Sequence, residues 1–398
     1  MKNLKIFGEE IIESSSIEQI KNCFGEEDLA VLTADAHFGY GHPIGGAVAF
    51  RNHISLSGVG FDIACGNKAV RTPLKVDDVD IAKTMDEIWK RIGFGTGTPN
   101  PEPVAHPVLD EIPELEVTIP ETVMNKLQKK AAAQLGTVGS GNHFVDLFRD
   151  EEGFLWIGIH FGSRGFGHNL TMGFIALSQG KEFGEKASEG SMNSAPILFD
   201  VHSTLGQDYI QALDVAGKYA YAGRDAVVDK VLEILGTTSN FEVHNHHNFA
   251  WKEHHFGDDY WVVRKGCTPA FPGQTGFIDA NMFDDSVIIE GVDSETSKQG
   301  LYSTVHGAGR VMSRRQAAGK FKWKGRRKIQ VQRGEINYKN TRLEAVERGI
   351  ELRGGGADES PQCYKKLDDV LKFHEGTIRV LHTLSPVGVA MAGDSLDI

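Results

Sequence analysis

"DAHFGYGHPIGGAVAF" (residues 35–50) is followed closely by "ISLSGVGFDIACGNKAVRT" (residues 54–72). In both stretches short apolar segments alternate with glycine-rich turns, which is typical of a β-sheet whose loops approach another group closely. The rest of the chain adds helices to this sheet without a regular alternation of strand and helix.

The periodicity of apolar residues predicts the other main elements. Helices are expected at residues 81–92, 121–135 and 206–235, and strands at about 155–160, 241–249, 260–264 and 286–290. Because strands and helices do not alternate regularly, the sequence favours an α+β fold with mixed β-sheets surrounded by helices over a doubly wound one.

Composition indicates a soluble globular protein with a large core, since 40% of the 398 residues are hydrophobic and 24% are charged. The chain lacks a linker-like segment, so residues 1–398 are expected to form a single domain. A surface excursion is expected at about 95–120, which holds six of the thirteen prolines. The N-terminus lacks the pattern of a secretory signal, and no run approaches the ~18 apolar residues of a membrane span, so a cytoplasmic location is expected.

The four cysteines are too few for a disulfide framework, and each is expected to be core filler or a ligand.

The formal net charge of −12 is unevenly distributed. Residues 310–333 carry ten Lys and Arg and no Asp or Glu. Such a run is often only a solvated face, but here it begins at the arginine of an unusual histidine motif, which favours a phosphate-bearing ligand.

Several candidate metal ligands stand beside glycines or at the ends of apolar strands. Asp62 and Cys65 lie three residues apart in "GFDIACG", and a thiolate selects a transition metal over magnesium or calcium. The histidines in comparable settings are His143, His160, His168, His244, His246 and His247. Any one of them is as readily a hydrogen-bonded core or surface histidine. Together they favour a two-metal site that shares the cysteine sulfur, and manganese would suit such mixed N, O and S ligands.

The stretch "STVHGAGR" (residues 303–310) places His306 beside Gly307, Ala308 and Gly309, with Arg310 at its end. A neutral, oriented histidine is a competent nucleophile toward phosphorus, and the bare backbone would let a phosphate approach its N–H groups. Arg310 would then neutralise phosphate charge. The alternative is a simple turn, which the short motif by itself does not exclude.

Seven stretches, in order from residue 58 to residue 315, together resemble the RtcB family of RNA ligases. They are "GVGFDIACG", "LGTVGSGNHF", "HFGSRGFGH", "HHNFA", "VRKGCTPA", "GQTGFI" and "HGAGRVMSR". The resemblance implies an RtcB-like fold and an enzyme of RNA repair or tRNA splicing that uses GTP and two Mn²⁺ ions. Such an enzyme joins an RNA 3′-phosphate or 2′,3′-cyclic phosphate to a 5′-hydroxyl end. An activating partner protein is a further implication.

The resemblance also implies roles for individual residues. His306 would carry GMP on its imidazole, and Asn142, Asp146 and residues 307–310 would bind the nucleotide. The metal ligands would be Asp62, Cys65, His143, His160 and His247, whereas His244 and His246 have no assigned counterpart and are interpreted as strand residues. With RNA as substrate, the basic run becomes a candidate RNA-binding segment through Arg314, Arg315, Lys322, Lys324, Arg326 and Arg327.

The chain departs from the family pattern at two places. Residues 279–283 replace a stretch that normally lies near the nucleoside, and Met391 aligns with a lysine. These departures suggest a divergent branch, such as the one linked to a release-factor homologue, and they leave the choice of nucleotide open. Two other functions compete with ligation: a metal-dependent phosphohydrolase, and a noncatalytic RNA-binding or translation-rescue module. The intact "HGAGR" favours the ligase over both.

Overall fold

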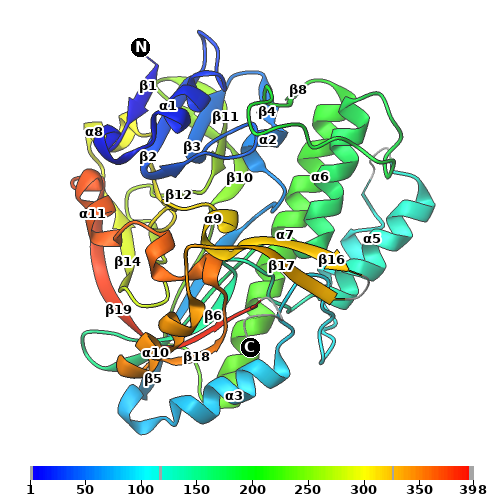
Figure 1. The fold of residues 1–398 in the computed structure, drawn as a ribbon. Helices are drawn as coiled ribbons and strands as arrows, with labels where there is room; N and C mark the ends of the chain where they lie inside the picture. The colour runs from blue at the N-terminus through cyan, green and yellow to red at the C-terminus, as the bar shows by residue number, and fades with distance from the viewer. Residues whose placement is uncertain (1–2, 116–118, 325–326, 394–398) are drawn as a thin grey trace.

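The computed structural model describes residues 3–115, 119–324 and 327–393. Two large β-sheets form the centre of the molecule, and the helices lie mainly around them (Figure 1). Strands and helices mix without regular alternation, which confirms the predicted α+β class with mixed sheets.

The larger sheet has eight strands in the order β13-β14-β19-β6-β7-β5-β9, with β18 parallel to β19. These strands are β5 (Gly66–Lys75), β6 (Phe144–Arg149), β7 (Phe154–Phe161), β9 (Phe241–His246), β13 (Thr275–Ile278), β14 (Ser286–Gly291), β18 (Glu351–Gly354) and β19 (Ile378–Met391). Strand β7 reads "FLWIGIHF" and is buried after its first residue, as expected for a strand covered on both faces.

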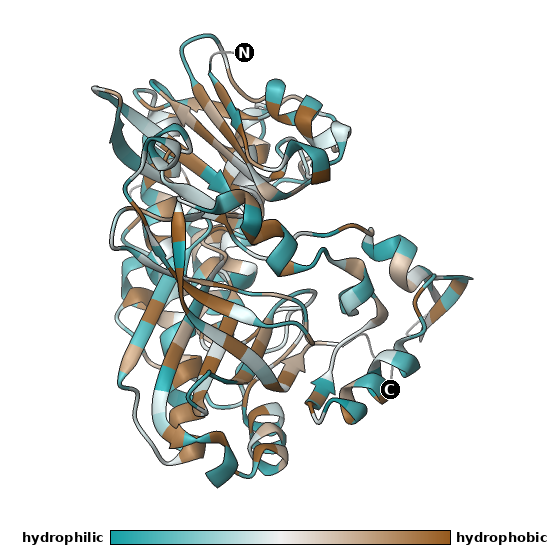
Figure 2. Cartoon of the chain, turned by 90° about the vertical axis from the view of Figure 1, so that its left-hand side faces the viewer, coloured by the Kyte–Doolittle hydropathy of each residue, from teal (hydrophilic) through white to brown (hydrophobic). Residues whose placement is uncertain are grey.

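The second sheet has five strands in the order β1-β2-β3-β11-β10. Its strands are β1 (Leu4–Ile6), β2 (Leu29–His37), β3 (Ile44–Phe50), β10 (Asn248–His255) and β11 (Asp258–Lys265). Three two-stranded ladders complete the sheets: β4 (His53–Ser55) with β8 (Leu198–Asp200), β12 (Cys267–Pro269) with β15 (Ser303–Val305), and β16 (Gly319–Lys324) with β17 (Arg327–Arg333). Brown, apolar segments recur along the strands in Figure 2.

The α-helices of the described residues include the three that the sequence predicted. They are α1 (Ser14–Lys21), α2 (Leu56–Val59), α3 (Ile81–Arg91), α4 (Val108–Glu111), α5 (Glu121–Gln134), α6 (Arg164–Ser178), α7 (Thr204–Leu235), α8 (Glu295–Gln299), α9 (Arg314–Ala318), α10 (Tyr338–Glu347) and α11 (Leu367–Leu371). The long α7 begins where the Ser203 side chain accepts from the Gly206 N–H and ends at Gly236, whose φ of 64° is left-handed. The helices predicted at 81–92, 121–135 and 206–235 are thus confirmed as α3, α5 and α7.

The strand predicted at 241–249 is instead two strands. Strand β9 ends at His246 and pairs with β5 in the larger sheet, whereas β10 begins at Asn248 and pairs with β11 in the five-stranded sheet. The sequence pattern does not reveal where the chain crosses from one sheet to the other, because the backbone is extended in both strands. His247 lies at the crossover and therefore between the two sheets.

The proline-rich segment at 95–120 contains α4 and packs against the body through part of its length. Val108 and Ile112 are buried, and Glu102 pairs with Arg91 and Lys230. Across the described residues, no helix combines the length and the apolar character that crossing a lipid bilayer requires.

Candidate active site

Three candidate metal ligands meet where strands of the larger sheet begin or end. Cys65 directly precedes β5, His143 directly precedes β6, and His160 is the penultimate residue of β7. The Cys65 Sγ lies 3.4 Å from His160 Nε2 and 3.6 Å from His143 Nε2. One ligand atom from each of the three buried residues lies within 4.8 Å of the others. These distances suit a metal ion held between them.

The two other predicted ligands border this group of three. Asp62 Oδ2 lies 2.9 Å from His143 Nε2. The His247 ring centroid lies 5.0 Å from that of His160 and 4.9 Å from that of His306. His247 thus lies between the cysteine-histidine group and the predicted nucleophile.

The electrostatics of the group favour a bound cation. Burial lowers the pKa of His143 and of His247, so both imidazoles are neutral and have a lone pair for a metal. Burial also raises the pKa of the Cys65 thiol, so a cation would have to displace its proton. The Nδ1 atoms of His143, His160 and His247 are buried without a hydrogen-bond partner among the described residues. This N, S and O donor set fits a transition-metal ion, such as Mn²⁺, better than Ca²⁺.

His306 is held by a buried carboxylate that the motifs did not identify. Its Nδ1 lies 2.6 Å from Asp35 Oδ2, and its backbone N–H donates to the same oxygen at 3.1 Å. Burial lowers the pKa of His306, but the charge and hydrogen bond of Asp35 outweigh it and hold that pKa above its usual value. The pairing assigns the proton to Nδ1 and leaves the lone pair of the neutral ring on Nε2.

The glycines after His306 allow the chain to pass close to Asp35. Gly309 has φ of 78°, and a Cβ at this position would lie 2.1 Å from the Asp35 carbonyl oxygen. A larger residue is therefore excluded from this turn by both conformation and space. The backbone of the "HGAGR" motif (residues 306–310) thus passes close to Asp35, beside the Asp35–His306 pair.

Arg310 is already engaged by protein groups. Its guanidinium donates to Tyr364 Oη at 2.8 Å, to the Asp358 carbonyl at 2.6 Å and to Glu359 Oε2 at 3.3 Å. Glu359 and Tyr364 also form a hydrogen bond with each other. Any phosphate contact by Arg310 would therefore share the guanidinium with these partners.

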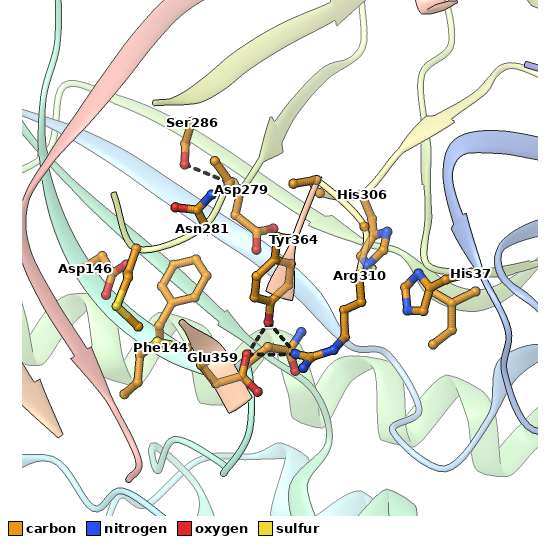
Figure 3. A pocket seen from close by; sticks show the side chains of 18 of the residues that line it. His37, Phe144, Asp146, Asp279, Asn281, Ser286, His306, Arg310, Glu359 and Tyr364 are labelled. Atoms are coloured by element: carbon orange, nitrogen blue, oxygen red, sulfur yellow. Dashed lines mark hydrogen bonds and ion pairs between the residues drawn. The ribbon is translucent and has the colours of Figure 1, made fainter. Parts of the chain in front are cut away.

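His306 and Arg310 line one end of a pocket, whereas Asp146 and Phe144 line the other end (Figure 3). Tyr364 lies between the two ends, and Asp279 borders the side nearest His306. The remaining lining side chains include Asn142, Phe148, Asn281, Met282, Ser286, Glu359 and Met391. The pocket therefore joins a polar end suited to phosphate chemistry to a partly apolar end.

The apolar end contains the predicted nucleotide-binding residue Asp146 and the Met391 departure, whereas the 279–283 departure extends from Met282, which packs with Phe144, to Asp279 beside Gly307. Burial raises the pKa of Asp146 well above its usual range, and its carboxyl accepts from the Ala390 N–H at 3.1 Å. Met391 and residues 279–282 line the same pocket. Asn142 is a neighbour of the metal group, with its Nδ2 3.4 Å from His160 Nε2.

The predicted RNA-binding residues lie on and beside the β16–β17 hairpin. Arg314, on α9, is partly neutralised because it pairs with Asp358 at 2.7 Å and also with Glu359. Arg315 and Lys322 are exposed. Lys324 and Arg327 face each other in the strand register, but their side chains lie outside the described part of the chain, and Arg326 lies outside it entirely.

Sequence reasoning missed Asp35, Tyr364 and Glu359 as site residues. Asp35 had a usable signal, because its carboxylate interrupts the mostly apolar stretch that forms β2, and the structure buries it fully. Tyr364 and Glu359 had none, since they belong to short turns near residues 357–364 that reach the site only through tertiary packing.

Comparisons with known proteins agree with this geometry. The family model described as "tRNA-splicing ligase RtcB" matches residues 17–392. The chain is 31% identical to the tRNA-splicing ligase RtcB of Archaeoglobus fulgidus, covering 96% of this chain and 92% of that protein. It is 30% identical to the RNA-splicing ligase RtcB of Escherichia coli strain K12, covering 94% of each. The chain therefore belongs to the RtcB family of RNA ligases.

Proposed function

We propose that this protein joins an RNA end bearing a 3′-phosphate, or a 2′,3′-cyclic phosphate opened by water, to a 5′-hydroxyl end, using GTP and Mn²⁺. The observation that carries the proposal is the position of His306. Its Nδ1 is fixed by Asp35 at 2.6 Å, and its ring lies beside His247, which borders the Cys65 group. The nucleophile at one end of the pocket thus lies next to the metal ligands, with His247 between them.

The chain's own residues account for the first step. His306 Nε2 attacks the α-phosphorus of GTP, the bond from that phosphorus to the bridging oxygen breaks, and pyrophosphate leaves. Asp35 keeps the proton on Nδ1 and stabilises the positive charge that develops on the ring. Cys65, Asp62, His143, His160 and His247 would hold the ions, which when bound withdraw charge from phosphate oxygens as Lewis acids.

The second step breaks the nitrogen-phosphorus bond that the first step forms, and the third step joins the RNA ends. An oxygen of the RNA 3′-phosphate attacks the phosphorus on His306, the nitrogen-phosphorus bond breaks, and GMP passes to the RNA. The 5′-hydroxyl then attacks the activated 3′-phosphate and GMP leaves. A phosphohydrolase would keep the metal group but would not need the Asp35–His306 pair, and that pair favours ligation.

Self-labelling tests the proposal directly. The protein is incubated with Mn²⁺ and α-labelled GTP, denatured, and examined for label that stays on the chain. We expect label on the parent and on the His254→Ala control, in which an exposed histidine is removed, and none on His306→Ala. Label on His306→Ala, or RNA joining without any labelled protein, would overturn the mechanism.

We further propose that the basic hairpin binds RNA phosphates. Removing four charges, at Lys322, Lys324, Arg326 and Arg327, should weaken RNA binding and reduce its salt slope by up to about 3. The matched control removes four exposed lysines elsewhere: Lys83, Lys90, Lys252 and Lys372. Self-labelling should survive in both variants, because GTP lies in the pocket. Equal RNA affinities for the two variants would mean that the basic residues of the hairpin only face solvent and do not bind RNA.

A further inference from the structure

Arg224, in the middle of α7, is a fully buried guanidinium next to the metal group. Among the described residues it forms no ion pair with a carboxylate, and the neighbouring Asp225 pairs with Lys68 at 2.7 Å. Burial lowers the pKa of Arg224 to about 10, which shows the cost of placing this cation in the core. A cation in such a place is retained only where several acceptors hold it.

Arg224 has four acceptors, and three of them adjoin a candidate metal ligand. Its Nη1 donates to the Ala64 carbonyl at 3.0 Å and to the Phe161 carbonyl at 2.6 Å. Its Nη2 lies 2.9 Å from His246 Nδ1. Ala64, Phe161 and His246 directly adjoin Cys65, His160 and His247 respectively.

The backbone at Ala64 needs this support. Ala64 has φ of 59°, a left-handed conformation that costs a non-glycine residue about 1–2 kcal/mol. Its N–H donates to the Asn248 carbonyl at 2.8 Å, while its carbonyl accepts from Arg224. Hydrogen bonds to both the N–H and the carbonyl of Ala64 therefore stabilise the strained turn that precedes Cys65.

The two histidines without an assigned role are the other partners of the guanidinium. Arg224 Nε donates to His244 Nε2 at 2.9 Å, and His246 accepts at Nδ1. Because a guanidinium only donates, both rings must be neutral with these nitrogens unprotonated. His244 then carries its proton on Nδ1, which faces Asp225 Oδ1 at 3.4 Å. His244 and His246 are thus acceptors for Arg224. Of the three histidines in residues 244–247, His247 therefore remains as the candidate metal ligand.

We propose that Arg224 is a positioning residue of the metal site, holding the segments of Cys65, His160 and His247 at a fixed spacing, with His244 and His246 as its acceptors. The inference rests on the proposed metal site. Arg224 touches neither the ions nor the reacting atoms. Its planar fork reaches three segments at once, which the single ammonium of a lysine does not reproduce.

The test measures metal binding rather than ligation. Mn²⁺ affinity and stoichiometry are measured by equilibrium dialysis on the folded protein, and the ligand-field spectrum with Co²⁺ reports the geometry. We expect Arg224→Lys to bind Mn²⁺ about 10–100-fold more weakly, with an altered Co²⁺ spectrum, as for other losses of groups that orient ligands. Unchanged affinity and spectrum in a folded Arg224→Lys protein would overturn the proposal.

The control is a second buried guanidinium. Arg264 is also fully buried, but its partners are Glu253, Ser303 and the Leu301 carbonyl. Arg264→Lys should lower thermal stability and leave Mn²⁺ affinity within about twofold. Equal losses of affinity in both arginine variants would assign Arg224 a general role in stability and refute the positioning role.

Two further variants keep the proposal testable if Arg224→Lys does not fold. His244→Gln retains an oxygen acceptor for Arg224 Nε, whereas His244→Leu removes it. We expect weaker Mn²⁺ binding, by about tenfold, only in the leucine variant, and equal affinities would count against the proposal. Cys65→Ser separates this inference from the proposed function: if the parent's Mn²⁺ binding does not depend on Cys65, the metal site itself is wrong.

Discussion

Asp35→Asn and Asp35→Ala should slow the self-labelling of His306 to very different extents. The carboxylate has a defined partner on each oxygen. Oδ2 accepts the His306 backbone N–H at 3.1 Å and faces His306 Nδ1 at 2.6 Å, while Oδ1 accepts from Thr33 Oγ1 at 2.6 Å. The side chain is fully buried, so water does not replace a lost partner.

An asparagine fits this arrangement in only one orientation. With its amide nitrogen toward His306, it would face the backbone N–H, which places two donors together. With its oxygen toward His306, it accepts both N–H groups, and its nitrogen donates to Thr33 Oγ1, whose single proton is then donated to the Gly45 carbonyl 2.9 Å away. The favourable orientation therefore keeps the proton on Nδ1 and leaves Nε2 reactive.

The expected magnitudes follow from what each variant loses. Asparagine replaces a charge-assisted hydrogen bond of about 1.5–3 kcal/mol by a neutral one of about 0.5–1.5 kcal/mol, so labelling should slow by roughly 5–30-fold. Alanine leaves two buried donors of His306 without an acceptor and removes the support of the ring. We expect a loss of about 10²–10³-fold in that variant.

The pH dependence of the self-labelling rate provides a second test of the role of Asp35. The neutral ring is the nucleophile, and Asp35 holds the pKa of His306 above its usual value despite burial. Labelling by the parent should therefore rise with pH through that pKa, and the rise should move to lower pH in Asp35→Asn. The assay is single-turnover labelling with α-labelled GTP and Mn²⁺ across pH. Equal defects in the two variants, or an unshifted profile in Asp35→Asn, would refute the assignment of Asp35 as the group that orients His306.

Three further predictions concern other parts of the molecule. Met391→Lys should increase the preference for GTP over ATP in self-labelling by roughly tenfold or more, because a thioether donates no hydrogen bond to the base; unchanged selectivity would mean that the base is recognised elsewhere. Elemental analysis of Cys65→Ala should show that both ions are lost or much weakened, because a shared thiolate would contact both; two ions held at near-parental affinity would exclude sharing. Glu253→Gln should lower the free energy of unfolding by about 3 kcal/mol, since it leaves the buried Arg264 without its carboxylate. Although burial opposes it, the charge of Arg264 holds the pKa of Glu253 below its usual value, so this contribution is present above about pH 4.3 and is lost as pH falls further; urea unfolding at pH 7 and at lower pH measures both effects.

Sequence patterns predicted the elements with regular periodicity and the local surroundings of the candidate ligands. Cys65, His143 and His160 each stand beside a glycine or at the end of an apolar strand, and these are the positions that a sheet brings to one edge. The crossover at His247 was not predictable in this way. Extended backbone continues through it, and only the pairing partners of β9 and β10 differ.

Long-range partners account for most of what the sequence did not reveal. Asp35 and His306 are 271 residues apart and meet through the packing of β15 against β2. Arg310 looked free to bind phosphate because its partners Glu359 and Tyr364 lie about fifty residues further along the chain. Arg224 belongs to a clear helical period, but that period gives no reason for a cation on the buried face of α7.

The structure places the Asp35–His306 pair and the metal group on different elements from the apolar wall of the pocket. His306 directly follows β15 and Asp35 belongs to β2, while the metal group lies at the ends of β5, β6 and β7. Met282 and Met391 pack in one apolar cluster with Phe144, which Figure 3 shows beside Asp146 at the end of the pocket away from His306. Within the described part of the chain, neither of these methionines contacts Asp35 or His306 through a hydrogen bond, whereas Asp279 pairs with Gly307 in a β-bridge and its Oδ1 lies 3.5 Å from His160 Nδ1. We therefore expect the departure at Met391 to change only the apolar wall of the pocket and to leave the Asp35–His306 pair intact, and we expect the departure at Asp279 to affect the His306 side as well.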